Sequence, residues 1–222
     1  MSIELNFGGL LDELNLVKNL ELKTYLIITY LNASNKPQQI KEFLNYLLEA
    51  ETYSNILKND SVVYFQRLKE CLLKSSPLCG FPYVINSMNI VNEFIETKFE
   101  GLEVEHALRY GSENNSNNQN ELDYNNGTKL FGSIYDVKTE KLTSKLATNS
   151  QDMKNFIIQD IYGKLLSNFS LLSFEETELI VITSLLALNV PPQLKSHLIG
   201  AKNAGISKEL LDQLQEVFKS QQ

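Results

Sequence analysis

The chain has 222 residues, a formal net charge of −7, 43% hydrophobic residues and 21% charged residues. A chain of this length can bury a hydrophobic core without disulfides or structural metals. The acidic balance and the scattered Lys and Arg argue against nucleic acid or an anionic membrane as a partner, because both need a basic face. No apolar run approaches the roughly 20 residues that cross a bilayer, so we expect no membrane partner.

The two ends of the sequence show no recognised targeting signal. The start, Met1-Ser2-Ile3-Glu4, lacks the basic segment and apolar stretch of a secretory signal, and its early acidic residues are unlike a mitochondrial presequence. The last three residues, Ser220-Gln221-Gln222, differ from the Ser-Lys-Leu peroxisomal signal. We therefore expect an intracellular protein, cytoplasmic by default, with a mitochondrial location left open.

Helical spacing of apolar residues dominates the N-terminal part. Residues 21–33 and 38–52 form one candidate helix pair, joined around Pro37. Residues 61–75 place apolar side chains three to four positions apart, which indicates a buried helical stripe. Another helix is expected to begin at Gly80-Phe81-Pro82. The stripe consists of Val62, Phe65, Leu68, Cys71 and Leu72.

The segment 111–126 is rich in Asn and nearly free of apolar residues. Such a segment cannot bury enough apolar surface to offset its ordering entropy, so it is predicted to be a loop or a disordered linker. It divides the chain into an N-terminal part, 1–110, and a C-terminal part, 127–222. In the C-terminal part, residues 128–137 and 151–168 again have helical spacing.

Three helices are predicted to close the chain. Ser173 and Glu176 form a capping box at the start of the first. This helix is apolar nearly all round from Leu179 to Leu188, which is typical of a buried helix. Pro191-Pro192 favours the first turn of a second helix, and residues 208–219 form the last. No strand pattern competes, so the predicted fold class is all-α.

A weak internal repeat supports a duplicated helix–turn–helix unit. Residues near 30 and residues near 190 match when the sequence is shifted by 154 positions. The two copies are expected to pack against one another. The matched pairs are Ile28/Ile182, Thr29/Thr183, Asn35/Asn189, Pro37/Pro191, Gln39/Gln193, Lys41/Lys195 and Leu44/Leu198.

Two segments carry a resemblance to the carboxymuconolactone decarboxylase and alkylhydroperoxidase-D-like (AhpD-like) superfamily. Gly80–Met88 (GFPYVINSM) resembles the GFPxxxNAL segment that opens a helix in that family, and Pro192–Gly205 resembles its ELRxHxRxALNxG helix. Gly127–Tyr135 and Tyr162–Leu166 look like linking segments of longer, two-repeat members. The resemblance covers about 21–98 and 127–219 of the chain.

The resemblance implies an AhpD-like helical bundle with two pseudo-repeats, of which the N-terminal one is degenerate. In the peroxidase branch of the family, a glutamate, a C-x-x-C pair and a histidine form a proton relay. The family spacing assigns the histidine to His197 and the glutamate to Glu178. In the first repeat, Thr24 and Phe43 occupy the corresponding positions, so at most one functional site per chain is expected.

The two cysteine positions of the relay fall on Val190 and Gln193. The thiols that the chain does have, Cys71 and Cys79, lie elsewhere and have neither redox-pair nor zinc spacing. Reduction of a peroxide by a protein dithiol needs a reactive thiolate and a resolving partner. Dithiol peroxidase activity is therefore not expected.

Acid–base chemistry remains open, because the decarboxylase branch of the family lacks these cysteines too. His197 can pass a proton near neutral pH, and Glu178 can orient its imidazole. Gln193 lies one helical turn before His197 on the same face and can donate a hydrogen bond to a substrate. The resemblance implies a lyase or isomerase acting on a small carboxylated or lactone-type molecule. We expect no cofactor and no metal, since no phosphate loop or ligand cluster appears.

The alternative is a non-catalytic helical scaffold or partner-binding protein that keeps the fold. In that interpretation His197 is a satisfied structural residue, and Glu178 stabilises the first turns of its helix through the macrodipole. A homo-oligomer is expected under either hypothesis. The resemblance implies it, and we expect the final helices to expose apolar residues, namely Leu210, Leu214 and Phe218.

Overall fold

The computed structural model describes residues 5–105, 107, 109 and 117–221. These residues form helices and contain no strand, so the all-α prediction is confirmed. The N-terminal helices are α1 (Phe7–Glu13), α2 (Leu20–Ala33), α3 (Pro37–Glu49), α4 (Ser54–Lys58), α5 (Ser61–Cys79) and α6 (Phe81–Lys98). The others are α7 (Asn117–Tyr135), η1 (Asp136–Lys138), α8 (Thr139–Asn149), α9 (Gln151–Asn155), η2 (Phe156–Leu166), α10 (Phe174–Ala187), α11 (Pro191–Asn203) and α12 (Lys208–Lys219). No helix among the described residues is long and apolar enough to cross a membrane.

The duplicated unit seen in the sequence is present in the structure. The pair α2–α3 corresponds to the pair α10–α11, because the first and last residues of each helix lie 154 positions from those of its counterpart. A proline occupies the first helical position of both α3 and α11, where a missing N–H costs no hydrogen bond. The capping box of Ser173 and Glu176 is formed at the start of α10. Local signals in the sequence therefore set both units.

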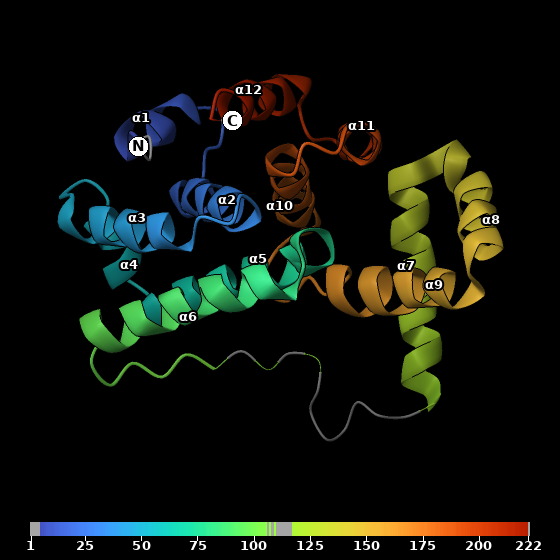
Figure 1. Cartoon of the computed structure of the whole chain (residues 1–222), viewed down its shortest axis with the longest axis horizontal. Coiled ribbons are helices and arrows are strands. Elements are labelled where there is room, and N and C mark those ends of the chain that lie inside the picture. The colour runs from blue at the N-terminus through green and yellow to red at the C-terminus, as the bar shows by residue number, and fades with distance from the viewer. Residues whose placement is uncertain (1–4, 106, 108, 110–116, 222) are drawn as a thin grey trace.

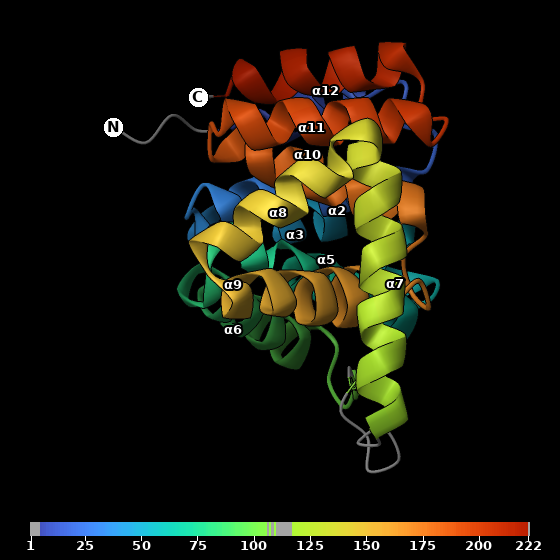
Figure 2. The same cartoon turned by 90° about the vertical axis from the view of Figure 1, so that its right-hand side faces the viewer.

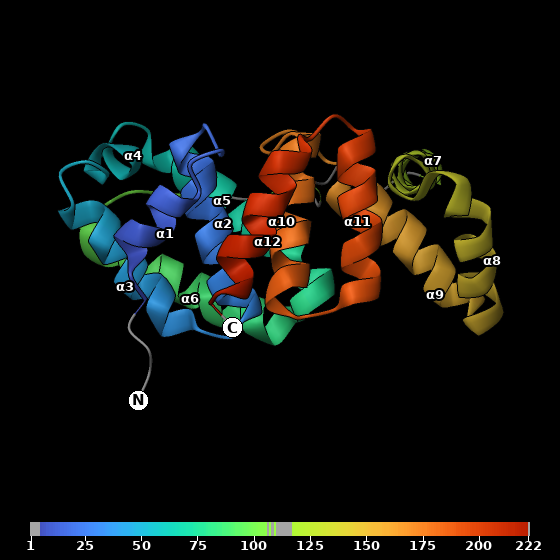
Figure 3. The same cartoon turned by 90° about the horizontal axis from the view of Figure 1, so that it is seen from above.

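The two units meet through their most apolar helices. Helix α10 packs against α2, α5 and α11, and it lies between α2 and α11 when the molecule is seen from above (Figure 3). Both α2 and α10 are buried over most of their length. One hydrophobic cluster contains residues of both, so a single core joins the N-terminal and C-terminal parts of the chain. This shared core holds α10 in a fixed position.

A separate group of helices, α7 to α9 with η2, stands at one side of the molecule (Figure 1). Helix α7 crosses η2 at a steep angle, as Figure 2 shows. Here the structure corrects the linker prediction for 111–126. Residues 117–126 are the first half of α7, while 111–116 lie outside the described residues. The segment is helical because it packs against η2, an interaction that its composition does not reveal.

Glycines let the backbones approach closely where these helices cross. A Cβ atom on Gly127 of α7 would lie 1.8 Å from the carbonyl oxygen of Ile158, and one on Gly163 of η2 would lie 1.9 Å from that of Asp123. A Cβ on Gly200 of α11 would likewise lie 2.8 Å from Cα of Ile134. No larger residue fits at these three positions without moving a helix. The crossings therefore fix the middle of α7 against η2 and its C-terminal end against α11.

A buried ionic cluster ties η2 to α5. The Arg109 guanidinium pairs with the Glu70 carboxylate, and it also donates to the backbone oxygens of Lys164 and Leu165, each at 3.0 Å. Lys74 Nζ donates to the backbone oxygen of Leu166 at 3.1 Å. Buried charges need such partners to offset their lost hydration. The cluster holds the C-terminal end of η2 in place.

The final helix differs from its prediction. Leu214 and Phe218 of α12 are buried within the chain, and the Phe218 ring stacks on Tyr30 with ring centroids 4.9 Å apart. The expectation that they are exposed is wrong, because the apolar face of α12 covers α2 and α10. Leu210 is half-buried. Self-association stays a prediction from the resemblance.

Candidate functional site

The duplicated unit brings Glu178 and His197 together. Glu178 lies in the second turn of α10, and His197 lies in the middle of the helix that follows. His197 Nδ1 is 3.0 Å from Glu178 Oε2, which is hydrogen-bond distance. The two residues are only 4% and 1% exposed, respectively. Of the three residues singled out in the sequence, these two form a direct contact in the core.

The contact with Glu178 fixes how His197 can act. A carboxylate only accepts hydrogen bonds, so the imidazole donates its Nδ1–H to Glu178, and in the neutral imidazole the lone pair is on Nε2. The same arrangement of a buried carboxylate behind an imidazole sets the tautomer and stabilises the imidazolium in other acid–base sites. Nε2 faces away from Glu178 and toward Tyr135 of α7. It is therefore the nitrogen available for proton transfer.

Two tyrosines extend the pair into a chain of four side chains. The Tyr135 hydroxyl lies 3.5 Å from His197 Nε2 and 3.1 Å from the hydroxyl of Tyr162 on η2. When Nε2 carries the lone pair, Tyr135 donates to it and Tyr162 can donate to Tyr135. Burial raises the pKa of both phenols. Both tyrosines therefore keep their protons and act as hydrogen-bond donors at neutral pH.

The glycine crossings explain why these tyrosines meet His197. Tyr135 ends α7, close after Ile134, whose backbone contacts Gly200 of α11. Tyr162 directly precedes Gly163 on η2. Sequence reasoning missed both tyrosines as site residues. The available signal was that each lies in a segment that resembles the family, but nothing in the sequence showed that the two segments cross.

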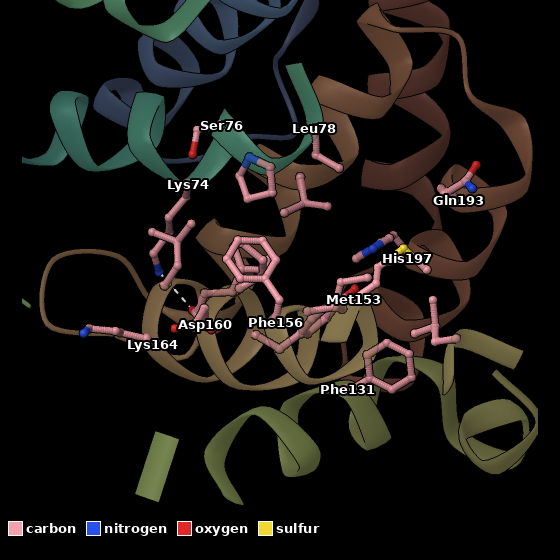
Figure 4. Close-up of a pocket in the computed structure, with 18 of the residues that line it drawn as sticks. Lys74, Ser76, Leu78, Phe131, Met153, Phe156, Asp160, Lys164, Gln193 and His197 are labelled. Carbon is pink, nitrogen blue, oxygen red and sulfur yellow. Dashed lines mark hydrogen bonds between the residues drawn. The ribbon is translucent and has the colours of Figure 1, made fainter. Parts of the chain in front are cut away.

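A large cavity opens beside this chain of side chains. Its volume is about 1190 Å³, and it is lined by residues of α5, α6, α7, α8, α9, η2, α10 and α11. Figure 4 shows His197 and Gln193 on one side of it and Lys74, Asp160 and Lys164 on the other. Most of the lining is apolar, as in many small-molecule sites. The apolar lining includes Leu73, Leu78, Phe81, Phe131, Leu142, Leu146, Met153, Phe156, Ile157, Ile161 and Leu165.

Gln193 lies at the edge of the cavity and is exposed. It is on the first turn of α11, one helical turn before His197. Its amide points away from His197 in Figure 4. Gln193 can therefore meet a molecule that enters the cavity, but it is not part of the buried chain of hydrogen bonds.

The first unit has no comparable pair. The Thr24 hydroxyl, at the position of Glu178, is 2.8 Å from the hydroxyl of Tyr64. Phe43, at the position of His197, is fully buried and packs against Phe7 with ring centroids 5.0 Å apart. Neither Thr24 nor Phe43 lines the large cavity. The described part of the first unit therefore has a packed core where the second has a polar site.

The two thiols lie outside the cavity. Cys71 is buried in the core, and burial raises its pKa. Cys79 is half-buried, burial also raises its pKa, and its Sγ accepts a hydrogen bond from Asn32 Nδ2 at 3.3 Å. A thiol with a raised pKa is a poor nucleophile at neutral pH. Neither residue has the environment of a reactive thiolate.

Comparison with known proteins finds two relatives of the same name. A Schizosaccharomyces pombe protein called Peroxisomal protein 2 is 29% identical over 204 residues, which cover 91% of this chain and 83% of that protein. A Saccharomyces cerevisiae protein, also called Peroxisomal protein 2, is 28% identical over 161 residues, which cover 66% of this chain and 57% of that protein. No family model and no solved structure matches the chain.

Proposed function

We propose that the chain is an AhpD-like member of the carboxymuconolactone decarboxylase superfamily that works as a cofactor-free lyase or isomerase. One observation supports this most directly. A buried Glu178–His197 pair, 3.0 Å apart, borders a cavity large enough for an organic substrate. A carboxylate hydrogen-bonded to an imidazole is a common arrangement for general acid–base catalysis near neutral pH. The substrate is a carboxylated or lactone-type molecule, as the resemblance implies.

In the proposed reaction, His197 Nε2 removes a proton from a carbon next to the substrate carbonyl. The electron pair of the broken C–H bond moves onto the carbonyl oxygen and forms an enolate. The Tyr135 hydroxyl, which must turn from His197 Nε2 to the substrate, stabilises this enolate by a hydrogen bond. Glu178 stabilises the imidazolium that results. Return of the proton to another carbon completes an isomerisation. In a decarboxylation the electron pair of the broken C–C bond moves onto the carbonyl oxygen as CO₂ leaves, and the enolate carbon then takes a proton from His197 Nε2, which has first taken that proton from solvent.

Solvent-deuterium exchange tests the proposal without knowledge of the natural substrate. A panel of β-keto acids and unsaturated lactones is incubated with the protein in D₂O, and NMR follows loss of the C–H signal beside the carbonyl. We expect exchange with one class of compound and a loss of about 10²- to 10⁴-fold in His197→Gln. Lys195→Gln is the matched control, because Lys195 is exposed on α11 and does not line the cavity. Equal exchange in the two variants would sink the proposal.

A second candidate is the non-catalytic, partner-binding protein. The observation that favours it is the open apolar rim of the cavity, where Phe81 is 63% exposed and Phe156 is 56% exposed. Exposed apolar patches of this kind mark interaction sites. Under this hypothesis, Phe81→Ser with Phe156→Ser abolishes capture of a partner from cell extract, and His197→Gln does not. The opposite pattern would favour the enzyme.

The relatives bear on location. Both carry the name Peroxisomal protein 2, and we propose that this chain also associates with peroxisomes instead of the cytoplasm expected from the sequence. Imaging of the chain with a fluorescent tag at the N-terminus, beside a peroxisomal marker, tests this. Diffuse fluorescence in cells with normal peroxisomes would contradict it.

A further inference from the structure

The cavity beside His197 is larger than the proposed chemistry requires. Pockets that hold drug-sized ligands have volumes of roughly 300–1000 Å³. At about 1190 Å³, this cavity exceeds that range. A small keto acid or lactone bound at His197 would leave most of the space to water. The remaining volume therefore points to a further part of the ligand.

The lining tells which kind of group fills that volume. The cavity face of η2 includes residues 156–157, 160–162 and 164–166, groups that recur every four positions along this π-helix. The same cavity is lined by Leu73 and Leu78 of α5, and by Leu142 and Leu146 of α8. All four leucines are half-buried, and Leu78, Leu142 and Leu146 pack against the core. Apolar surface left open in a cavity is stabilised by an apolar occupant.

The polar groups are distributed unevenly around the cavity. The hydrogen-bonding atoms of His197, Tyr135 and Tyr162 gather on one side, and apolar residues such as Phe156 separate them from Lys74, Asp160 and Lys164 (Figure 4). Lys74 is not available to a ligand there, because its amine is fully buried and donates to the backbone oxygens of Leu166 and Asn168 and to Thr177 Oγ1. Between the two sides the lining is apolar, which suits an apolar chain that extends from a polar group at His197.

We propose that the ligand of this cavity is a single-chain amphiphile, an alkyl-chain carboxylic acid or its lactone, with its polar end at His197 and Tyr135. Its tail lies along η2, between Ile161 and Leu165 on one side and the leucines of α5 on the other. This inference rests on the proposed function for the position of the head group. It adds the substrate class, which is a free acyl-chain compound instead of a small polar acid.

Calorimetric titration with hexanoate, octanoate, decanoate and dodecanoate, below their micellar concentrations, tests the inference. Each added methylene should tighten binding about fourfold until the cavity is full. Ile161→Trp, which fills the tail region, should weaken dodecanoate binding about tenfold or more and change hexanoate binding little. Ile199→Trp is the matched control, because Ile199 is 40% exposed on α11 and does not line the cavity.

The outcomes separate this inference from the proposed function. If affinity rises with chain length and falls in Ile161→Trp, the inference stands even when no deuterium exchange occurs. If short acids exchange deuterium and affinity does not depend on chain length, the tail site is wrong and the proposed function survives. Binding to phosphatidylcholine vesicles in place of free acids would overturn the inference. So would a dimer, detected by light scattering, that Phe156→Asp dissociates while no acid binds.

Discussion

Asn35 and Asn189 occupy the same left-handed position in the two copies of the duplicated unit, with φ angles of 54° and 51°. Each lies between the two helices of its unit. In both turns the next residue donates back into the preceding helix, from Lys36 N to Leu31 O and from Val190 N to Leu185 O. A left-handed residue that ends a helix in this way is usually Gly, and sometimes Asn.

The matched turns predict matched responses to substitution. Replacing either asparagine by Gly should leave the free energy of unfolding within about 0.5 kcal/mol of its original value, because Gly adopts this φ without strain. Replacing either by Ala should cost about 1–2 kcal/mol, since a Cβ disfavours the left-handed region and Ala has no compensating side-chain contact. Urea denaturation of the four variants measures this. Equal stability of the Ala and Gly variants would show that the turn relaxes.

Two glycines of α7 provide a pair for testing the helix crossing. Gly127→Ala should destabilise the fold by about 3 kcal/mol, because the new methyl meets the rigid backbone of Ile158. Gly132→Ala should stabilise it by about 0.5–1 kcal/mol, since Gly132 is helical with nothing within 4 Å of a built Cβ. Thermal unfolding of both variants checks the prediction. It fails if the two shift the melting temperature in the same direction.

The hydrogen bond between Tyr135 and Tyr162 predicts a coupling. Tyr135→Phe should cost about 1–2 kcal/mol, because the Tyr162 hydroxyl and His197 Nε2 each lose a buried partner. The double variant with Tyr162→Phe should cost less than the sum of the two single changes, by about 1 kcal/mol. A double-mutant cycle in urea gives this number. Additive effects would mean that the two hydroxyls are not coupled in solution.

The lowered pKa of Lys74 predicts that the free energy of unfolding rises at alkaline pH. Burial lowers its pKa from 10.5 to about 8, although the Glu70 carboxylate opposes the shift. Between these two values the unfolded chain binds a proton that the folded chain has released, so the free energy of unfolding increases with pH. The gain for this group is about 3 kcal/mol.

Comparison with Lys74→Met isolates the contribution of Lys74 from the tyrosines and lysines that titrate in the same range. The free energy of unfolding of both proteins is measured by denaturation at about pH 7.5 and pH 10. The original protein should gain more stability between these two pH values than the variant, and the difference is the contribution of Lys74. Parallel changes in the two proteins would indicate that Lys74 stays charged, held by its three hydrogen-bond acceptors.

The sequence was informative where a feature depends on neighbouring residues. The capping box of Ser173 and Glu176 and the prolines that open α3 and α11 are local signals, and the structure contains each of them. The sequence also pointed to the contact of His197 with Glu178, because the repeat and the family spacing assign these residues to two helices that pack directly against each other. The all-α class rests on the same kind of periodicity.

Features that depend on packing between segments far apart in the sequence could not be predicted from it. Residues 117–126 look like a linker in composition, yet they form a helix because Gly127 and Gly163 let α7 cross η2 closely. Tyr135 reaches His197 because α7 also crosses α11, where Gly200 lies against the backbone of Ile134. The burial of Phe218 likewise depends on a partner, Tyr30, that lies far away in the sequence. Composition and periodicity carry no information about such pairings.

The packed first unit has a consequence for how this chain can change. Phe43 and the Thr24–Tyr64 hydrogen bond close the position that the second unit keeps polar and open. The packed first unit supports the shared core. The residues that line the cavity of the second unit can therefore be substituted without loss of that core. Installing a carboxylate and an imidazole at Thr24 and Phe43 would therefore not create a second site. It would bury two polar groups in a packed core without a cavity for a ligand, and it would destabilise the first unit.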